Sequence, residues 1–244
     1  MTIIKQITDA IESVEGVKLL DVDPGKATNR TVVTFVGEPE PVVQAAFLAI
    51  KKASEIIDMS KHKGEHPRQG ATDVCPLVPV ANITMEECVQ WAHRLGEMAG
   101  RELDVPFYMY EYAATRPERR NLAEIRVGEY EALPEKLRKA EWKPDYGPAK
   151  FNPRAGAAVI GARDFLVAYN VNLNSTSERR ANSVAFDVRE KGRILRKGDP
   201  VSGEMVRDES GESVRVPGTC KAVKGIGWYI PEYGVAQVSM NLTN

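Results

Sequence analysis

The sequence has 244 residues, of which 43% are hydrophobic and 27% charged, a composition that excludes a disordered or fibrous chain. Its 33 Lys and Arg residues nearly balance 34 Asp and Glu, giving a net charge of -1, so no excess positive charge favours nucleic acid or an anionic membrane surface. The three cysteines are too scattered for a disulfide framework or a zinc site, and neither a signal peptide nor a membrane-spanning apolar run is recognisable. We therefore expect a cytoplasmic protein without a metal.

The first part of the chain predicts two helices that flank a β-hairpin. Isoleucines at three- and four-residue intervals predict a helix that ends near Gly16. Residues 17–22 and 31–36 are β-branched and apolar, and the turn formers between them favour a paired hairpin. The apolar pattern over 42–59 then predicts a long amphipathic helix that lies across the hairpin.

Five further segments are expected before residue 157: a polar loop, a strand, a helix, a second strand and a long arm, at 60–72, 74–80, 84–103, 105–110 and 116–156. The two prolines of the first of these strands are typical of an edge or bulged strand. Thr84 and Glu87 have the spacing of a capping box at the helix start. The arm holds short helical stretches near residues 122 and 137, and a loop of such length is usually functional or disordered.

Two strands, a helix, a charged stretch and two more strands are expected after the arm, at 157–160, 165–173, 175–191, 193–219, 220–226 and 235–242. The first two strands lie around a turn at Gly161, Ala162 and Arg163. The charged stretch has no periodicity, which favours a mobile insertion or a long hairpin.

The order of these elements predicts the fold class. The first part reads αββαβ and the part from Phe165 reads βαββ, and both are fragments of the βαββαβ plan with its split βαβ. We therefore predict an α+β protein with two ferredoxin-like α/β sandwich subdomains, at residues 1–173 and 174–244. The first lacks its opening strand and the second is truncated.

Two of the three histidines, His62 and His66, bracket a basic turn in the segment KHKGEHPRQGATD. An imidazole in such a segment can reach a ligand and titrate near neutral pH, so a functional role is favoured over a solvated turn with incidental histidines. Zinc binding by the pair is disfavoured, because Gly64 and Pro67 argue against the helix that would place both imidazoles on one face. His93, in a predicted amphipathic helix, is interpreted as a packing or surface residue.

The loop from Gly147 to Gly156 is the second candidate site. Its glycines, prolines, aromatic ring and two cations suit a flat acidic ligand, and a rigid interdomain crossing explains the same composition equally well. Arg163 offers a further cation at the next turn, and Asp23 begins a polar cluster at the hairpin end that asparagine and aspartate turn chemistry largely explains. The loop residues are Gly147, Pro148, Ala149, Lys150, Phe151, Asn152, Pro153, Arg154, Ala155 and Gly156.

The segment HKGEHPRQGATDVCPLVPV, residues 62–80, closely resembles the signature of glutamate formimidoyltransferases, which also form the N-terminal part of formimidoyltransferase-cyclodeaminases. LLDVDPGKATNRTVVTFVG, ELDVPFYMYEYAA, IRVGEYEALPEKL, DYGPAKFNPRAGAAVIGARDFLVAYNVNL and KGIGWY resemble the family in the expected order. The resemblance covers the chain outside the insertion at about 193–219. Gln69, Thr72 and Leu77 stand where the family favours more apolar or aromatic residues.

The resemblance implies transfer of a formimidoyl group from N-formimidoyl-L-glutamate to N5 of tetrahydrofolate, in histidine degradation and one-carbon metabolism. In the family, the histidine that corresponds to His66 is catalytic, and the loop that corresponds to Gly147–Gly156 contacts folate. Tetrahydrofolate is the co-substrate and no metal takes part. The fold implied is two ferredoxin-like subdomains, and the family commonly dimerises, so we expect a homodimer that acts on small molecules.

One imidazole can perform both proton transfers of this reaction. With an unperturbed pKa near 6.5, His66 can accept a proton from N5 and return it to the leaving nitrogen, a role worth about 10²- to 10⁴-fold in rate. Our hypothesis from chemical type and location is that Arg68, Arg163 and Lys150 bind carboxylates of the substrates, while Asp23 orients His66 or the amidinium.

Two alternatives stay open beside formimidoyl transfer. Family members commonly begin with a strand before the first helix and continue beyond the final strand, so we expect the 244-residue chain to be poorly active. It would then be a folate-binding fragment without catalysis. The other alternative is a formyltransferase that uses N-formylglutamate, because a formyl and a formimidoyl group differ by one heteroatom.

Overall fold

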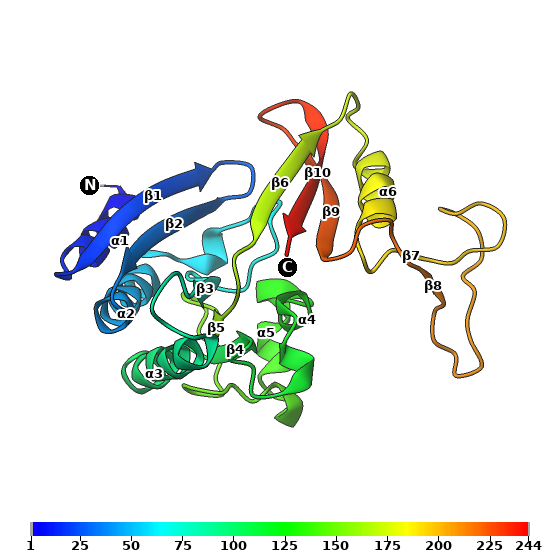
Figure 1. The fold of residues 1–244 in the computed structure, drawn as a ribbon. Coiled ribbons are helices and arrows are strands. Elements are labelled where there is room, and N and C mark those ends of the chain that lie inside the picture. Colours follow the sequence, from blue (N-terminus) through cyan, green and yellow to red (C-terminus); the bar gives the residue numbers. More distant parts are fainter. Residues whose placement is uncertain (1, 244) are drawn as a thin grey trace. The chain divides into compact units, whose positions relative to one another are not determined.

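The computed structural model describes residues 2–243 and divides into two compact units, Met1–Arg163 and Asp164–Asn244 (Figure 1). Helices, parallel strands and antiparallel strands are all present, so the fold is α+β in two subdomains, as predicted. The boundary lies before the predicted position near Leu173, because the strand that follows residue 165 pairs within the second unit. None of the helices within the described part is long and apolar enough to cross a membrane.

The first unit opens with a helix, a two-stranded antiparallel hairpin and a long helix: α1 (Ile3–Glu12), β1 (Val17–Gly25), β2 (Arg30–Gly37) and α2 (Pro39–Ile56). The hairpin and both helices are confirmed. Pro39 lies in the first turn of α2, where its missing N–H leaves no helical hydrogen bond unmade, so the helix begins before the predicted residue 42.

A three-stranded parallel sheet organises the rest of this unit, in the order β3-β5-β4. Its elements and the short helices around it are η1 (Met59–Lys61), β3 (Val74–Leu77), α3 (Met85–Glu102), β4 (Phe107–Glu111), η2 (Pro117–Arg119), α4 (Leu122–Ile125), α5 (Glu129–Lys136), η3 (Ala140–Trp142) and β5 (Ala158–Ala162). The capping box of Thr84 and Glu87 is present at the start of α3. β3 is an edge strand, as its prolines predict.

The split βαβ takes a different form in this unit from the one predicted. β3, α3 and β4 form the βαβ unit, but the inserted strand β5 is parallel to both neighbours, whereas the β1–β2 hairpin forms a separate sheet. The reason is the long connection between β4 and β5. It returns the chain to the end of the sheet at which β4 begins, so that β5 runs in the same direction as β4. Gly161 and Ala162 lie in β5 rather than in a turn.

Side chains of β4 alternate between two buried layers. Phe107 and Met109 pack in the core that includes α2 and α3, and Tyr108 and Tyr110 pack in the core that includes α4 and α5. Figure 1 shows α3 on one side of this sheet and α4 and α5 on the other. Because both faces are covered, β4 and β5 are continuous apolar runs, as buried parallel strands commonly are.

The second unit contains an antiparallel sheet in the order β6-β10-β9, covered by one helix: β6 (Val167–Asn172), α6 (Glu178–Val188), β9 (Val223–Ile230) and β10 (Val235–Leu242). β6, α6 and β9 form a split βαβ with β10 between the strands, as the ferredoxin-like plan predicts. Gly227 lets the helix approach β9, since a Cβ there would lie 2.1 Å from the backbone nitrogen of Asn182.

β6 is an edge strand of this sheet, and within the described residues it pairs with β10 alone. Val167, Tyr169 and Val171 follow one another on one face of β6, with exposed fractions of 59%, 55% and 38%. Helix α6 packs on β9 and β10. The sheet therefore has a row of apolar side chains that α6 does not cover.

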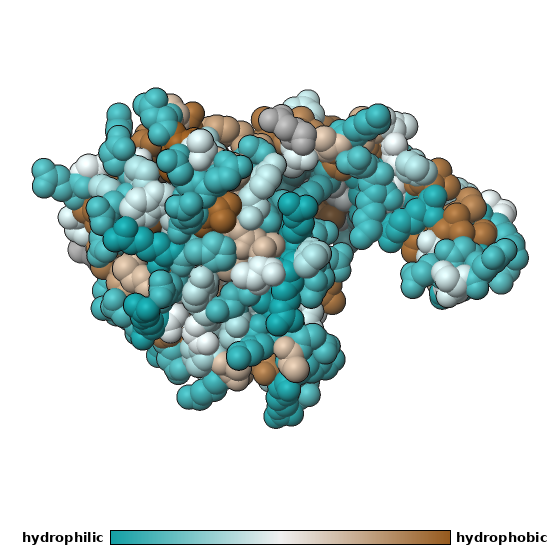
Figure 2. Space-filling view, turned by 60° about the horizontal axis from the view of Figure 1, so that its bottom comes forward, coloured by the Kyte–Doolittle hydropathy of each residue, from teal (hydrophilic) through white to brown (hydrophobic). Residues whose placement is uncertain are grey.

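The charged stretch at residues 193–219 is a long hairpin-like arm of the second unit. Its base is the antiparallel pair β7 (Arg193–Ile194) and β8 (Arg215–Val216). Figure 2 shows apolar surface on this arm, where Leu195, Val201 and Met205 are exposed. Of the two predicted forms, the structure has the hairpin.

Candidate active site

The turn that carries His66 is held on one side by the tip of the β1–β2 hairpin. The Asn29 amide donates to the carbonyl oxygen of Lys63 at 2.8 Å. Gly64 lies so close to the hairpin that a Cβ there would be 2.4 Å from the carbonyl oxygen of Thr28. Asn29 has a φ of +47°, in the left-handed region that asparagine adopts more readily than most residues. The hairpin tip therefore determines where the imidazole lies.

On its other side, the same turn contacts the loop at residues 147–156. The Ala157 amide donates to the carbonyl oxygen of Gln69 at 3.0 Å, and Gly70 and Gly156 form an isolated antiparallel bridge. Gly156 has a φ of +69°, and a Cβ on it would lie 2.1 Å from the Gln69 carbonyl oxygen, so only glycine fits without a backbone shift. The structure thus brings the two candidate segments of the sequence together within the first unit.

Both ring nitrogens of His66 have hydrogen-bond partners. Nε2 lies 2.6 Å from Nη1 of Arg30, and Nδ1 lies 2.7 Å from the carbonyl oxygen of Pro67. A guanidinium has only donors and a carbonyl oxygen only accepts, so we assign the proton to Nδ1 and the acceptor role to Nε2. His66 is therefore a neutral imidazole whose Nε2 lone pair points to Arg30.

The surroundings of His66 lower its pKa from the ordinary 6.5 to about 4. Burial is the largest cause, and the positive charges of Arg30 and Arg126 follow, while the hydrogen bond to Pro67 opposes them. The pKa of His66 in the folded protein is thus well below the ordinary value that the sequence alone leads one to expect. At pH 7 the imidazole is neutral and can accept a proton, but it binds that proton weakly.

Arg126 and Asp73 form a largely buried ion pair next to this imidazole. The second carboxylate oxygen of Asp73 accepts from the backbone amide of Gln69 at 2.9 Å. Burial raises the pKa of Asp73, and the charge of Arg126 and the hydrogen bond from Gln69 act against that rise. The pair therefore fixes the chain just after the histidine turn, and the Arg126 guanidinium is the member whose charge acts on His66.

Arg68 is engaged by two carboxylates of α5. Its guanidinium lies 2.7 Å from Oε1 of Glu131 and 3.1 Å from Oε2 of Glu129. The Glu129 carboxylate also accepts from the Arg68 backbone amide at 3.2 Å. Both terminal nitrogens of Arg68 thus contact protein carboxylates, and Nη2 also donates to the carbonyl oxygen of His62 at 3.2 Å.

Tyr130 connects Arg68 with the 147–156 loop. The Arg68 guanidinium carbon lies 5.9 Å from the centroid of the Tyr130 ring, and the Phe151 ring packs against the same tyrosine at 5.4 Å between centroids. The Tyr130 hydroxyl donates to the carbonyl oxygen of Pro153 at 2.6 Å. One aromatic side chain therefore links the histidine turn, α5 and the loop.

Asn152 holds the loop in shape from within. Its Oδ1 accepts from the backbone amides of Arg154 and Ala155, both at 3.0 Å, and its Nδ2 donates to the carbonyl oxygen of Asp104 at 2.7 Å. Gly147 has a φ of +78°. These contacts make the loop a preformed structure, and its glycines serve close packing of the backbone.

Two family models match the chain, and between them they cover almost all of it. The N-terminal subdomain of the formiminotransferase domain matches residues 1–163, and the formiminotransferase domain matches residues 168–244. The chain belongs to the formiminotransferase family. The first match ends at the boundary between the two compact units.

Curated relatives in this family are similar over the whole chain. The formimidoyltransferase-cyclodeaminase of Dictyostelium discoideum is 53% identical over 100% of this chain and 42% of its own length. The glutamate formimidoyltransferases of Streptococcus pyogenes and Thermoplasma acidophilum are 42% and 43% identical, and the match covers 73% and 72% of their lengths. The chain thus spans about two fifths of the length of the relatives named formimidoyltransferase-cyclodeaminase.

The remaining predicted site residues lie at different places in the first formiminotransferase subdomain. Asp23 lies on β1, and its charge acts on Arg30 rather than through a hydrogen bond to His66. Lys150 lies 3.7 Å from Asp104, and both side chains are more than half exposed. Arg163 follows β5 and hydrogen-bonds Tyr110, whose pKa burial raises to about 12 against the opposing charge of this arginine. Asp23 thus acts on Arg30, the hydrogen-bond partner of His66, whereas Lys150 and Arg163 interact with Asp104 and Tyr110.

Sequence reasoning missed the residues from a distant segment that contact the histidine turn at Arg68 or act on His66 by charge. Arg126, Glu129 and Tyr130 lie in the segment IRVGEYEALPEKL, which resembles the family but carries no local pattern that suggests a site. Arg126 pairs with Asp73, which lies 53 positions earlier in the chain, and a contact between such distant residues leaves no periodic signal in the sequence. Family resemblance of the segment was the one available indication.

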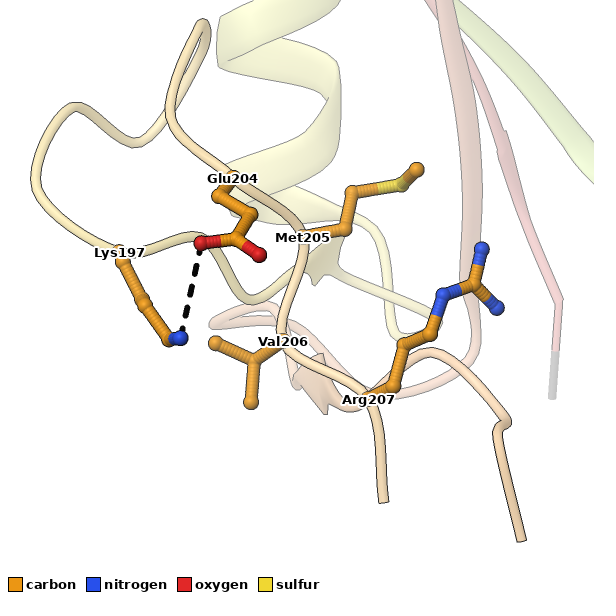
Figure 3. A pocket seen from close by; sticks show the side chains of 5 residues that line it. All are labelled: Lys197, Glu204, Met205, Val206 and Arg207. Atoms are coloured by element: carbon orange, nitrogen blue, oxygen red, sulfur yellow. Dashed lines mark ion pairs between the residues drawn. The ribbon is translucent and has the colours of Figure 1, made fainter. Parts of the chain in front are cut away.

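A pocket in the second unit lies elsewhere, on the arm (Figure 3). Its lining side chains are Lys197, Glu204, Met205, Val206 and Arg207. The Lys197 and Glu204 groups are 3.6 Å apart and mostly exposed, so solvent screens the pair. Residues 2–243 contain no group of three or more His, Cys, Asp and Glu side chains that could hold a metal ion.

Proposed function

We propose that the protein to which this chain belongs transfers a formimidoyl group from N-formimidoyl-L-glutamate to N5 of tetrahydrofolate, in histidine degradation, with His66 as acid and base. Family membership and the names of the relatives support the reaction class. The observation that carries the role of His66 is its neutral tautomer, with Nδ1 fixed by Pro67 and the Nε2 lone pair at a cluster of arginines.

The proposed step conserves atoms and protons. N5 of tetrahydrofolate attacks the formimidoyl carbon, and Nε2 of His66 accepts the proton that N5 loses. The imidazolium then gives this proton to the glutamate nitrogen, the bond between that nitrogen and the formimidoyl carbon breaks, and glutamate leaves. The lowered pKa makes the imidazolium a strong acid for the second transfer, at the expense of basicity in the first.

We propose the loop at residues 147–156 as the folate-binding segment. Its support is the preformed shape given by Asn152 and the contact of Phe151 with Tyr130, since a rigid loop loses little entropy when a ligand binds. Arg163 and Lys150 are proposed for the carboxylates of the folate tail. The same proposal includes a cytoplasmic homodimer, which family resemblance alone supports.

The experiment that tests the function mixes the protein with tetrahydrofolate and either N-formimidoyl-L-glutamate or N-formyl-L-glutamate, and follows the substituted folate by absorbance. Product from the formimidoyl donor is the expected result, and product from the formyl donor alone would change the donor. Folate binding without product from either would indicate the non-catalytic fragment.

The role of His66 is tested by His66→Ala with His93→Ala as the control. His93 lies in α3, outside the proposed site, and its Nδ1 is 2.9 Å from the hydroxyl oxygen of Tyr146. Transfer by His66→Ala should fall by about 10²- to 10⁴-fold with folate affinity retained, whereas His93→Ala should keep the wild-type rate. Unchanged turnover in His66→Ala would exclude the acid–base role.

A further inference from the structure

Arg30 differs from the other arginines near His66 because no protein carboxylate neutralises it. It is the first residue of β2, and its Nη1 donates to Nε2 of His66. Within the described residues its other donors have no hydrogen-bond partner, and no carboxylate lies at ion-pair distance. A guanidinium has five N–H donors in a planar arrangement that fits a carboxylate, so most of its binding capacity is unused.

The acids of this neighbourhood are already engaged by other residues. Glu129 and Glu131 contact Arg68, and Asp73 contacts Arg126. Burial and then the charge of Arg126 lower the pKa of Arg30, and the charges of Asp73 and Asp23 oppose them. Arg30 therefore carries positive charge that the protein does not compensate, although the residue as a whole is exposed to solvent.

We propose that Arg30 binds the α-carboxylate of the N-acylated glutamate donor, and that it releases Nε2 of His66 when it does so. This inference rests on the proposed function and assigns a substrate group to that site. It also assigns the carboxylate to a residue other than Arg68, whose guanidinium is already bound to two protein acids.

Covalent geometry selects the α-carboxylate among the acids of the substrates. The carbon of that carboxylate is two bonds from the leaving nitrogen, a distance of about 2.5 Å. A group that protonates this nitrogen from Nε2 must therefore lie next to the α-carboxylate. Arg30, which contacts Nε2 at 2.6 Å, is positioned to bind it.

The proposal also explains how the imidazole becomes available. In the form of the molecule described here, the Nε2 lone pair is occupied by a donor, and substrate can use it after Arg30 turns toward an anion. The arriving carboxylate offers two acceptor oxygens in place of one nitrogen, so the exchange favours a bidentate ion pair. An N-acyl amine that lacks the carboxylate would leave Arg30 on the imidazole.

The test measures binding in the full chain without requiring turnover. The probes are N-acetyl-L-glutamate and N-acetyl-4-aminobutyrate, which differ in the α-carboxylate and cannot transfer a formimidoyl group. Their dissociation constants are measured by NMR titration of the imidazole signals, with the signal of His66 assigned from a His66→Gln spectrum. The variants are Arg30→Ala and Arg30→Lys, and Arg94→Ala, an exposed arginine of α3 paired with Glu40, is the control.

The wild type should bind N-acetyl-L-glutamate about ten- to a hundredfold more tightly than N-acetyl-4-aminobutyrate, because the first probe forms a charge-assisted pair. Arg30→Ala should remove this preference, Arg30→Lys should keep part of it, and Arg94→Ala should keep all of it. Arg30→Ala should also raise the pKa of His66, since one of the charges that lower it is gone.

Three results would overturn the proposal. In the wild type these are equal binding of both probes and binding of neither probe, and in a folded Arg30→Ala protein it is an unchanged preference. Failure of the proposed function is a separate outcome. It would be seen as a normal preference for N-acetyl-L-glutamate together with no transfer to tetrahydrofolate, and in that case Arg30 would still be the carboxylate-binding residue.

Discussion

At the scale of single residues, Gln69 is buried without partners. Its side chain is 1% exposed, and neither its amide oxygen nor its amide nitrogen has a hydrogen-bond partner among the described residues. A buried polar group in this state costs about 1–3 kcal/mol. An apolar side chain at this position would avoid that cost.

We predict that Gln69→Met stabilises the protein. The substitution keeps the length of the side chain and removes both unpaired atoms, so the free energy of unfolding measured with urea should rise by about 1–2 kcal/mol. Gln44→Met on the exposed face of α2 is the control and should change it by less than about 0.5 kcal/mol. Lower stability of Gln69→Met would indicate that water or a ligand satisfies the amide.

The lowered pKa of His66 gives a prediction for stability against pH. In the unfolded chain the imidazole has its ordinary pKa of 6.5, and in the folded protein a pKa of about 4. Between these values the unfolded state binds more protons, so the free energy of unfolding should decrease as the pH falls from about 6.5 to about 4. His66→Gln should lose this part of the decrease, and parallel curves for the two proteins would contradict it.

The choice of His66 as the candidate residue could be made from sequence, but its proton affinity could not be predicted. The motif HKGEHPRQG resembles a known signature, and the spacing of two histidines in a polar turn made a site plausible. The pKa depends on burial and on Arg30 and Arg126, which reach the imidazole from 36 positions before it and 60 after it. Such three-dimensional effects have no counterpart in local sequence.

At the scale of elements, the hairpin positions the histidine turn through Gly64. A Cβ at this residue would lie 2.4 Å from the carbonyl oxygen of Thr28, so Gly64→Ala must move the turn away from the hairpin. A displacement near 1 Å can reduce catalysis by about 10²-fold, and we expect kcat/KM for formimidoyl transfer to fall by about ten- to a hundredfold. Gly225→Ala in β9, where the nearest atom lies at 3.6 Å, is the control. Normal kcat/KM in Gly64→Ala would refute this positioning.

The arm between β4 and β5 is anchored by a buried ion pair. Arg119 Nη1 lies 2.7 Å from Asp145 Oδ1, with side-chain exposures of 2% and 7%. Removing one partner of such a pair leaves an uncompensated charge, so Arg119→Met should lower the free energy of unfolding by about 3–5 kcal/mol. Arg138→Met removes an exposed pair with Glu135 and should cost at most about 1 kcal/mol. Similar small losses in both variants would contradict the structural role of Arg119.

Elements with local signals were predicted well, and their pairing was predicted less well. The capping box of Thr84 and Glu87, the alternation of the hairpin strands and the apolar stripe of α2 are each contained within a few turns or strands. The parallel direction of β5 depends on the path of the connection between β4 and β5, residues 116–156. That path is fixed by contacts such as the ion pair of Arg119 with Asp145. The sequence therefore indicated the strands but not their directions.

At the scale of the whole molecule, the arm of the second unit is a self-contained attachment. The hydrogen bonds of residues 195–214 within the described chain join residues of the arm to one another. Its base is the short pair of Arg193–Ile194 with Arg215–Val216. The loop at residues 147–156 has the opposite character, because Asn152 and Gly156 bind it to other segments.

We predict that replacing residues 195–214 by Asn-Gly leaves the protein folded. The two-residue turn suits the antiparallel base, and a shorter loop loses less entropy on closure, so the thermal unfolding midpoint should be unchanged or higher. Replacing residues 148–153 by Asn-Gly is the matched comparison and should lower that midpoint strongly. A large loss from shortening the arm would show that its contacts extend beyond it.

The edge strand β6 has a consequence for how the protein is made on the ribosome. All strands of the first unit have their partners once residue 162 has been synthesised, so His66 and the 147–156 loop can be in place early. β6 must wait for β10, which begins at Val235, and until then the row of Val167, Tyr169 and Val171 belongs to an unpaired strand. A nascent chain of this length thus contains a folded first unit that is followed by the unpaired strand β6. An unpaired strand can form hydrogen bonds with the wrong segment, so chaperone binding during synthesis should concentrate at β6.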